Sequence, residues 1–374
     1  MICWSLLLLA LGFFSLGLLT LFRSPDWNAW QLAVLAGEFG HWLALGAAAT
    51  AIAAAAVRGS GGALAWTTVG VAVVAAGCLL RPVFSVVGVA AEAQRELDRF
   101  GAPALAREGF AVTGLWARGP AKVRVETRAF SEGLELDFYG AVGRDNAPCV
   151  IVVHGGGWDG GDRAQLGAFN HWLAGRGYAV AAISYRLAPQ FPWPAQRDDV
   201  LAAVTFLKRE AGSLGIDAER LVLLGRSAGG QIAEAVAYAA KEPAIRGVVG
   251  FYAPSDLHFA YRFAREDDVL KSPGLIRRFL GGAPEEAREN YDSASALSLV
   301  TRDAPPTLLI HGEMDTLVWH RHSVRLEAVL ERAGVPCVLV SLPWATHAFE
   351  VNLAGPGGQV TRYALERFLA AVTR

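Results

Sequence analysis

The decapeptide Leu221 to Gly230 constrains the fold of this chain more than any other stretch. It reads L-V-L-L-G-R-S-A-G-G, so an apolar run leads into a G-x-S-x-G motif centred on Ser227, and a helix-forming sequence follows at once. This pattern predicts a buried strand, a sharp turn that lifts the serine hydroxyl above the sheet, and a helix. Ser227 is therefore a candidate nucleophile. Because a bare G-x-S-x-G also occurs by chance, the assignment depends on partners later in the chain.

Short apolar runs alternate with helical segments after Pro148. The apolar runs are 149–153, 179–183, 221–224, 248–251, 308–310 and 338–340. Between and after them lie the helix-like segments 165–176, 198–210, 228–240, 320–333 and 359–372. Runs this apolar are typical of strands buried on both faces, and the alternation predicts a mainly parallel sheet with helices on both sides. Two further strands, 122–130 and 134–142, are expected to open it as an antiparallel pair.

A glycine-rich loop, H-G-G-G-W at 154–158, follows the first of the buried strands. Residues without a β-carbon let backbone N–H groups approach a small anion closely, as the stabilisation of a tetrahedral oxyanion requires. Gly155 and Gly156 are the candidate donors, with Ala228, the residue after the serine, as the third. Neither of the phosphate-binding patterns, G-x-x-x-x-G-K-[ST] and G-x-G-x-x-G, is present in this loop.

A serine hydroxyl needs a histidine to take its proton, and the histidine needs an acid to orient it. His347 follows the last predicted strand, where a loop can reach back across the sheet, and Asp315 lies just beyond the strand that ends at Ile310. Asp256 and Glu313 compete with Asp315 for the acid. Among the other histidines, His311 is expected to be structural, His258 to lie in an insertion, and His320 and His322 to be solvated at the start of a helix. The last two alone would make an incomplete metal site.

Residues 256–292 fit the alternation poorly, because they are longer than an ordinary connection. They form either a small lid over the site or a surface insertion without a role in binding. Residues 91–121, where charges return between apolar residues, read as an amphipathic linker that lies against the membrane or against the domain that follows. The predicted division is a membrane region at 1–90, this linker, and a catalytic domain at 122–374.

The first ninety residues contain three apolar runs. Residues 2–22 carry no Asp, Glu, Lys or Arg, residues 63–80 carry none either, and residues 30–57 are interrupted only by Glu38 and His41. At about 1.5 Å per residue, such a run can cross a bilayer core. The positive start and the clear cleavage site of a signal peptide are missing, so three transmembrane helices are favoured. Glu38 and His41 share one helical face, either as a polar site within the membrane or, the favoured interpretation, in a helix–helix contact near an interface.

The charges flanking these runs predict an orientation. Arg23 would lie on the same side as Arg81, Arg95, Arg99 and Arg107, with Arg58 alone on the other side. The positive-inside rule then places the large C-terminal part in the cytoplasm, although the loss of one span would reverse it. The four cysteines suggest no disulfide framework, and a net charge of −1 without a basic cluster gives no reason to propose a nucleic-acid partner.

From about Val123 to its end, the sequence resembles α/β-hydrolases of the hormone-sensitive-lipase-like branch and bacterial acetyl- or feruloyl-esterase-like carboxylesterases. The resemblance rests on H-G-G-G-W with G-D at 161–162, S-Y-R-L-A-P at 184–189, the G-R-S-A-G-G run, and the contexts of Asp315 and His347. It implies an α/β-hydrolase fold, a triad of Ser227, His347 and Asp315, no cofactor, and a connection at 185–194 that shapes the pocket.

One position departs from this pattern. Relatives of the lipase-like branch usually carry Asp where this chain has Arg226. A cation there favours an acidic substrate or, the preferred interpretation, pairs with a nearby carboxylate. Prenylcysteine methylesterases are also similar and membrane-bound, but the third glycine and the R-L-A-P run fit the lipase-like branch better.

Together these features predict a membrane-anchored serine carboxylesterase that acts on a small-molecule or lipid ester, with membrane lipid around its first ninety residues. Trp158, Tyr185 and Trp193 are the predicted substrate contacts, and Phe191 and Trp344 are further aromatic candidates for the pocket or for packing. The alternatives are acyl transfer or prenylcysteine-ester hydrolysis by the same triad, and a non-catalytic membrane scaffold. A scaffold has no physical need for a nucleophile, a base, an acid and a glycine loop together.

Overall fold

Eight strands form one sheet in the computed structural model, which describes residues 2–374 apart from the side chains of residues 58–61. The side chain of Arg58, used in the orientation argument, lies outside the described residues. The strands are β1 (Val125–Ser131), β2 (Leu134–Tyr139), β3 (Ala147–Val153), β4 (Ala179–Ile183), β5 (Ile216–Arg226), β6 (Ile245–Phe251), β7 (Thr307–Gly312) and β8 (Cys337–Leu342). Their order across the sheet is β1-β2-β4-β3-β5-β6-β7-β8.

The sheet is mainly parallel, as the sequence predicts. Strand β2 pairs with β1 and with β4 in antiparallel fashion, whereas every pairing from β4 through β8 is parallel. All residues of β3 and β4 are buried, while β1 at the edge alternates between exposed and partly buried residues. The parallel arrangement brings the C-terminal ends of β3, β5, β7 and β8 to one edge, and the candidate residues follow these ends.

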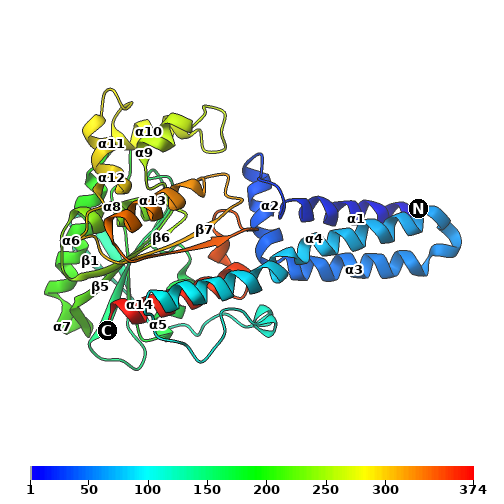
Figure 1. Ribbon diagram of the computed structural model, residues 1–374, viewed down its shortest axis with the longest axis horizontal. Coiled ribbons are helices and arrows are strands. Elements are labelled where there is room, and N and C mark those ends of the chain that lie inside the picture. Colours follow the sequence, from blue (N-terminus) through cyan, green and yellow to red (C-terminus); the bar gives the residue numbers. More distant parts are fainter. Residues whose placement is uncertain (1) are drawn as a thin grey trace.

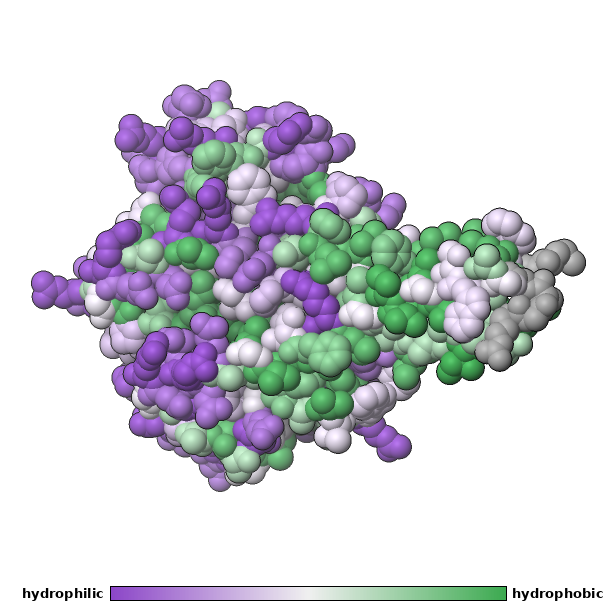
Figure 2. Space-filling model, turned by 45° about the vertical axis from the view of Figure 1, so that its right-hand side comes forward, coloured by the Kyte–Doolittle hydropathy of each residue, from purple (hydrophilic) through white to green (hydrophobic). Residues whose placement is uncertain are grey.

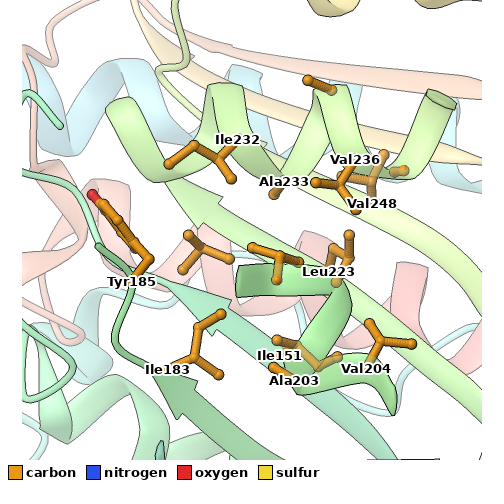
Figure 3. Packing of buried hydrophobic residues seen from close by; sticks show 14 of the residues in the cluster. Ile151, Ile183, Tyr185, Ala203, Val204, Leu223, Ile232, Ala233, Val236 and Val248 are labelled. Carbon is orange, nitrogen blue, oxygen red and sulfur yellow. The ribbon is translucent and has the colours of Figure 1, made fainter. Parts of the chain in front are cut away.

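Helices cover both faces of the sheet. They are α5 (Gly167–Gly175), α6 (Ala195–Arg209), α7 (Ala211–Leu214), α8 (Ala228–Ala239), α13 (Arg321–Ala333) and α14 (Pro356–Val372). Alternate residues of each central strand enter two separate apolar clusters, so Ile151 and Leu223 belong to one and Val150 and Val222 to the other. Figure 3 shows the first cluster, where Ile232 of α8 lies on the face that Ile151 and Leu223 share.

The segment after β6 is built from short helices: α9 (Leu257–Phe263), α10 (Ser272–Leu280), α11 (Arg288–Ala294) and α12 (Ala296–Leu299). Figure 1 shows them together at the top of the sheet domain. Phe279 of α10 is fully buried and its ring stacks on Trp158 at 4.3 Å between centroids. The segment therefore packs onto the glycine-rich loop instead of standing free in solvent.

Four helices precede the sheet: α1 (Ile2–Leu18), α2 (Trp27–Glu38), α3 (Gly40–Ala56) and α4 (Arg58–Arg99), and two short 3-10 helices, η1 (Val112–Trp116) and η2 (Phe349–Val351), occur further along the chain. Figure 1 shows α1, α3 and the first part of α4 extending side by side away from the sheet, with α2 across their base. Close packing joins them: a Cβ on Gly40 would lie 2.4 Å from the carbonyl oxygen of Leu79.

Helix α4 is longer than the sequence analysis predicts. It continues through Arg99, so residues 91–99 of the expected linker complete the same helix. Ala90, Ala93 and Leu97 are buried in the apolar cluster that also contains residues of α14. Their spacing of three and four residues places them on one helical face, so this end of α4 packs against the sheet domain.

Fewer helices could span a membrane than the three that the sequence analysis predicts. In the described chain, one helix, Gly62–Arg99, is long and apolar enough to cross a membrane. The count rises to two if α2 and α3, bent by 85° at their junction, act as one span, and α1 is shorter at 17 residues. Figure 2 shows hydrophobic residues over much of the projecting helices. A multi-pass arrangement therefore stays a prediction.

Candidate active site

Ser227 lies at the sharp turn between β5 and α8, with φ +52° and ψ −121°. A Cβ on Gly225 would lie 2.1 Å from the carbonyl oxygen of Gly229, and a Cβ on Gly229 would lie 2.3 Å from that of His154. Real side chains cannot approach backbone atoms so closely. The two motif glycines are thus required by contacts between neighbouring main-chain segments, and the strained conformation of Ser227 follows from them.

Asp315 and His347, which are 32 positions apart, form a buried pair beyond the ends of β7 and β8. His347 Nδ1 lies 2.7 Å from Asp315 Oδ2, and the N–H donates to the carboxylate. The other carboxylate oxygen accepts from the backbone N–H groups of Leu317 at 2.8 Å and Val318 at 3.0 Å. These two amides fix the carboxylate, which in turn fixes the plane of the imidazole.

Buried charge is compensated around Asp315. Burial by itself raises the pKa of this carboxyl, but His347 and His311 outweigh burial and hold the pKa below its ordinary value. His311 Nε2 lies 3.4 Å from Asp315 Oδ2 and donates to the carbonyl oxygen of Val318, while its Nδ1 faces Ser323 Oγ at 2.8 Å. His311 therefore stabilises the charged form of Asp315. This is the structural role that its position at the end of a strand predicts.

The competing carboxylate of Asp256 is engaged elsewhere. Asp256 caps the start of α9 through the N–H of Phe259 and pairs with Arg325 at 2.6 Å. For Glu313, the other competitor, it is the backbone carbonyl oxygen and not the carboxylate that accepts from Arg23, at 3.2 Å.

Two of the remaining histidines are less solvated than expected. His320 Nε2 lies 2.8 Å from Ser341 Oγ, and burial lowers its pKa to about 4. Burial also lowers the pKa of His322 to about 3, and His322 lines the candidate cavity. Both residues lie at the start of α13, where we expected solvated side chains. They face the protein interior instead. His258, by contrast, lies near the surface, 2.7 Å from Asp292.

The glycine-rich loop is folded back on itself beside Ser227. His154 Nδ1 donates to the carbonyl oxygen of Gly155 at 2.8 Å, and burial lowers the pKa of His154, which keeps this ring neutral. A Cβ on Gly156 would lie 2.2 Å from the carbonyl oxygen of Gly160. The N–H of Gly155 donates to Gln165 Oε1 at 2.8 Å, so this donor already has an acceptor. Gln165 escaped the sequence analysis because no motif marks it.

One cavity of about 570 Å³ connects these elements. It is lined by Ser227, Ala228 and His347, by the three glycines Gly155, Gly156 and Gly157, and by Gln165. Phe259 and Phe263 of α9 and Leu275 and Ile276 of α10 contribute to its wall. The segment 256–292 therefore closes part of the cavity. The interpretation of that segment as a lid stays a prediction.

The three predicted substrate contacts fall in different places. Trp158 lines the cavity, with its Nε1 donating to Gln231 at 2.8 Å. Within the described chain, Tyr185 and Trp193 lie outside the cavity lining. Tyr185 stacks on the ring of His154 and donates to its carbonyl oxygen at 3.1 Å, and Trp193 donates to Ser293 at 3.0 Å. Both side chains therefore stabilise the loops around the site through hydrogen bonds to other protein groups.

The departure at Arg226 is accounted for by an ion pair. Its Nε lies 3.0 Å from Glu350 Oε1, and both side chains are almost fully buried. Tyr252 donates its hydroxyl to the same oxygen, and the Tyr252 ring lies 4.0 Å from the His347 ring. This pairing favours the second of the two interpretations, a neighbouring carboxylate, over recognition of an acidic substrate.

The N-terminal helices reach the site, which the sequence analysis did not foresee. Trp27 and Trp30 of α2 line the cavity, and Trp30 Nε1 donates to the carbonyl oxygen of His347 at 3.3 Å. Glu38 accepts from the N–H of Gly357 at 2.9 Å and from Trp344 Nε1 at 3.3 Å. Glu38 thus caps α14 and joins α2 to the sheet domain. This contact between α2 and α14 favours the helix–helix interpretation over a polar site within the membrane, although the partner helix belongs to the sheet domain.

Comparisons with known proteins point to one chemistry. Residues 136–330 match the BD-FAE family model. Among curated relatives, the probable carboxylic ester hydrolase LipM of Mycobacterium tuberculosis is 27% identical over 70% of this chain and 68% of its own length. Esterase LipC of the same organism is 32% identical over 61% and 59%, and esterase LipI is 36% identical over 56% and 67%. The chain thus spans between about half and two thirds of the length of the relatives that head this comparison.

Solved structures share the fold. A Pyrobaculum calidifontis esterase has a TM-score of 0.59 at 22% identity, over 78% of this chain and 94% of its own. A bacterial heroin esterase has a TM-score of 0.58 at 23% identity, over 68% and 85%. The family model covers more than half of the chain, the curated relatives are ester hydrolases, and the fold is shared with solved esterases. The chain belongs to the BD-FAE family, among the α/β-hydrolase esterases.

Proposed function

We propose that this protein is a membrane-anchored serine carboxylesterase with Ser227, His347 and Asp315 as its triad. Ser227 Oγ attacks the carbonyl carbon of the ester while His347 takes the hydroxyl proton. As the carbon–oxygen bond breaks, His347 returns that proton to the leaving alcohol and an acyl-enzyme remains. Water, activated by the same imidazole, then releases the acid.

One observation carries the proposal: His347, held by the buried Asp315 at 2.7 Å, lines the same cavity as Ser227, which lies on a strained strand-to-helix turn. Asp315 stays ionised because its pKa is low, so it can hold the imidazole in one tautomer and stabilise its protonated form. The ester hydrolases among the relatives support the same reaction class.

The proposed oxyanion donors are the N–H groups of Gly155, Gly156 and Ala228. All three residues line the cavity beside Ser227. The Gly155 N–H joins the hole when the substrate oxygen replaces Gln165 Oε1, its present acceptor. Loss of one such donor typically slows turnover about a hundredfold or more.

The proposed organisation keeps the three parts given by the sequence: a membrane region at 1–90, a linker at 91–121, and a catalytic domain at 122–374 with its lid at 256–292. The apolar helix Gly62–Arg99 and the bent pair α2 and α3 support attachment to a membrane. Several spans and a cytoplasmic catalytic domain are the arrangement that the flanking arginines favour.

The test is a panel of esters with varied acyl and alcohol parts, hydrolysed by the wild-type full chain and by Ser227→Ala. We expect hydrolysis by the wild type, loss of most activity in the variant, and labelling of Ser227 by a fluorophosphonate. An intact, folded protein that neither hydrolyses any ester nor reacts with the fluorophosphonate would favour the scaffold alternative. Diversion of the acyl group to added alcohols would identify a transferase.

A further inference from the structure

Helix α2 forms one wall of the candidate active site. Trp27 and Trp30 line the cavity that contains Ser227 and His347, although they lie about two hundred or more positions earlier in the chain. Trp27 is 46% exposed, so its indole faces both the cavity and the outside of the protein. The wall therefore belongs to the same N-terminal region that carries the apolar helices.

The position of α2 relates this wall to a membrane surface. It meets α3 at 85°, so if α3 and α4 cross a bilayer, α2 lies nearly in the plane of that bilayer. Trp42, at the start of α3, is 51% exposed, and its ring lies 6.2 Å from that of Trp116, which is 49% exposed. Half-exposed tryptophans are typical of the interface between lipid and water. The base of the projecting helices, where α2 lies, carries this signature.

The cavity also opens through apolar residues. Phe263, Trp319 and Val351 line it and are 47%, 37% and 46% exposed, as Trp27 is. Exposed apolar residues that gather around one opening mark a site for an apolar partner. The projecting helices beside it are themselves largely hydrophobic on the surface (Figure 2).

Four of the five Asp and Arg side chains that line the cavity in the described chain have an oppositely charged partner, and the fifth, Asp268, accepts hydrogen bonds from Ser272 and from backbone N–H groups. Arg278 pairs with Asp159 at 3.0 Å, and Arg265 pairs with Asp267 at 2.9 Å. Arg226 is held by Glu350 at 3.0 Å. These pairs leave little net charge to select an ionic acyl group, so apolar contact dominates the recognition of the substrate chain.

We propose that the substrate is a long-chain amphiphilic ester dissolved in the bilayer, which enters the site past α2 with its apolar chain along Trp27 and Trp30. This inference rests on the proposed function, because it assigns the ester that Ser227 attacks. Helix α2 would then select substrates by presenting the opening at the height of the lipid carbonyl groups. We expect a soluble short-chain ester to gain little from this wall, because its acyl group offers little apolar surface for contact.

The experiment compares two esters with the same leaving group on the full chain in phosphatidylcholine nanodiscs. These are 4-methylumbelliferyl oleate, carried in the bilayer, and 4-methylumbelliferyl acetate, supplied in water. We expect the ratio of their kcat/KM values, oleate over acetate, to fall about tenfold in Trp27→Ala, since an apolar contact surface of a tryptophan is lost. Trp27→Phe, which keeps an aromatic ring, should restore most of the ratio.

The matched control is Trp66→Ala. Trp66 is 57% exposed on α4 and lies outside the cavity lining within the described chain, so the ratio should stay within twofold of the wild type. Equal ratios in Trp27→Ala, Trp66→Ala and the wild type would overturn the inference. So would efficient hydrolysis of the acetate with none of the oleate, which leaves the proposed esterase standing. If neither ester is cleaved and Ser227 resists the fluorophosphonate, the proposed function fails and the inference falls with it.

Discussion

The two halves of the candidate site are held by different means. Ser227 is fixed by main-chain packing, because Gly225, Gly229 and the loop at His154 approach one another too closely for any side chain. His347 instead lies on the loop after β8, and its hydrogen bonds run to Asp315 and to Trp30, which is 317 positions away. The first half depends on contacts within the turn and with the adjacent strand β3, whereas the second depends on a helix of the N-terminal region.

The contacts around the histidine loop show how far this dependence extends. Arg81 of α4 donates to the carbonyl oxygen of Pro343 at 3.4 Å, and Glu38 of α2 accepts from Trp344. Each contact comes from a helix of the N-terminal region and falls within four residues of His347. The region that carries the apolar helices therefore also braces the base of the proposed triad, which predicts that changes far from the chemistry affect turnover.

The largest expected effect concerns Asp315, the acid that holds His347. Asp315→Asn should lower kcat about 10⁴-fold, because an amide cannot hold the imidazole in the required tautomer or stabilise its charged form. Thermal unfolding should show a much smaller change. The control is Asp256→Asn, whose carboxylate pairs with Arg325 and caps α9. A greater loss of activity in Asp256→Asn than in Asp315→Asn would transfer the role of the acid to Asp256.

Next in size is a change that breaks the main-chain half. Gly229→Ala places a Cβ 2.3 Å from the carbonyl oxygens of Val153 and His154, which are backbone atoms in the centre of the sheet. We expect a loss of stability on the order of 3 kcal/mol, measured by denaturant unfolding, together with most of the esterase activity. Gly212→Ala is the control, because nothing lies within 4 Å of its added Cβ. Equal stability of the two variants would refute the packing argument.

This difference also explains what could be predicted from the sequence. The strands, the sharp turn at Ser227 and the placement of Asp315 near His347 could be predicted from local patterns. Apolar runs, glycine spacing and the order of the strands are each visible in short stretches of sequence. Glu38 could be recognised as an unusual charge in an apolar run, but its partner Gly357 could not be identified. Contacts between segments separated by hundreds of residues leave no periodicity, so Trp27 and Trp30 went unrecognised. Gln165, only ten positions from Gly155, was missed because it belongs to no motif.

A third variant weakens the long-range half from a distance. Glu38→Ala removes the acceptor for the Gly357 N–H and for Trp344 Nε1 in a buried place, at a cost of about 1 to 3 kcal/mol. We expect a lower unfolding midpoint and, if about 1 kcal/mol of that cost falls on the placement of His347, a fall in kcat of about fivefold. Glu92→Ala, an exposed glutamate on α4, should leave both quantities unchanged. An unchanged kcat in Glu38→Ala, despite a lower unfolding midpoint, would show that the contacts of Glu38 stabilise the fold without affecting catalysis.

The smallest expected effect isolates a single hydrogen bond. Trp30→Phe keeps an aromatic ring at the cavity wall but removes the Nε1 donor to the carbonyl oxygen of His347, a bond of 3.3 Å worth about 1 kcal/mol at most. Because that oxygen belongs to the backbone of the base itself, its loss should loosen the imidazole relative to Ser227 and lower kcat two- to fivefold, with little change in unfolding. Trp66→Phe makes the same chemical change on an exposed helix face and should have no effect.

If Glu38→Ala and Trp30→Phe are combined, we expect a loss of kcat smaller than the product of the two separate losses, because both residues hold the same loop. Multiplicative losses would mean that α2 acts on the site through two independent routes, and the picture of a single braced loop would have to be abandoned.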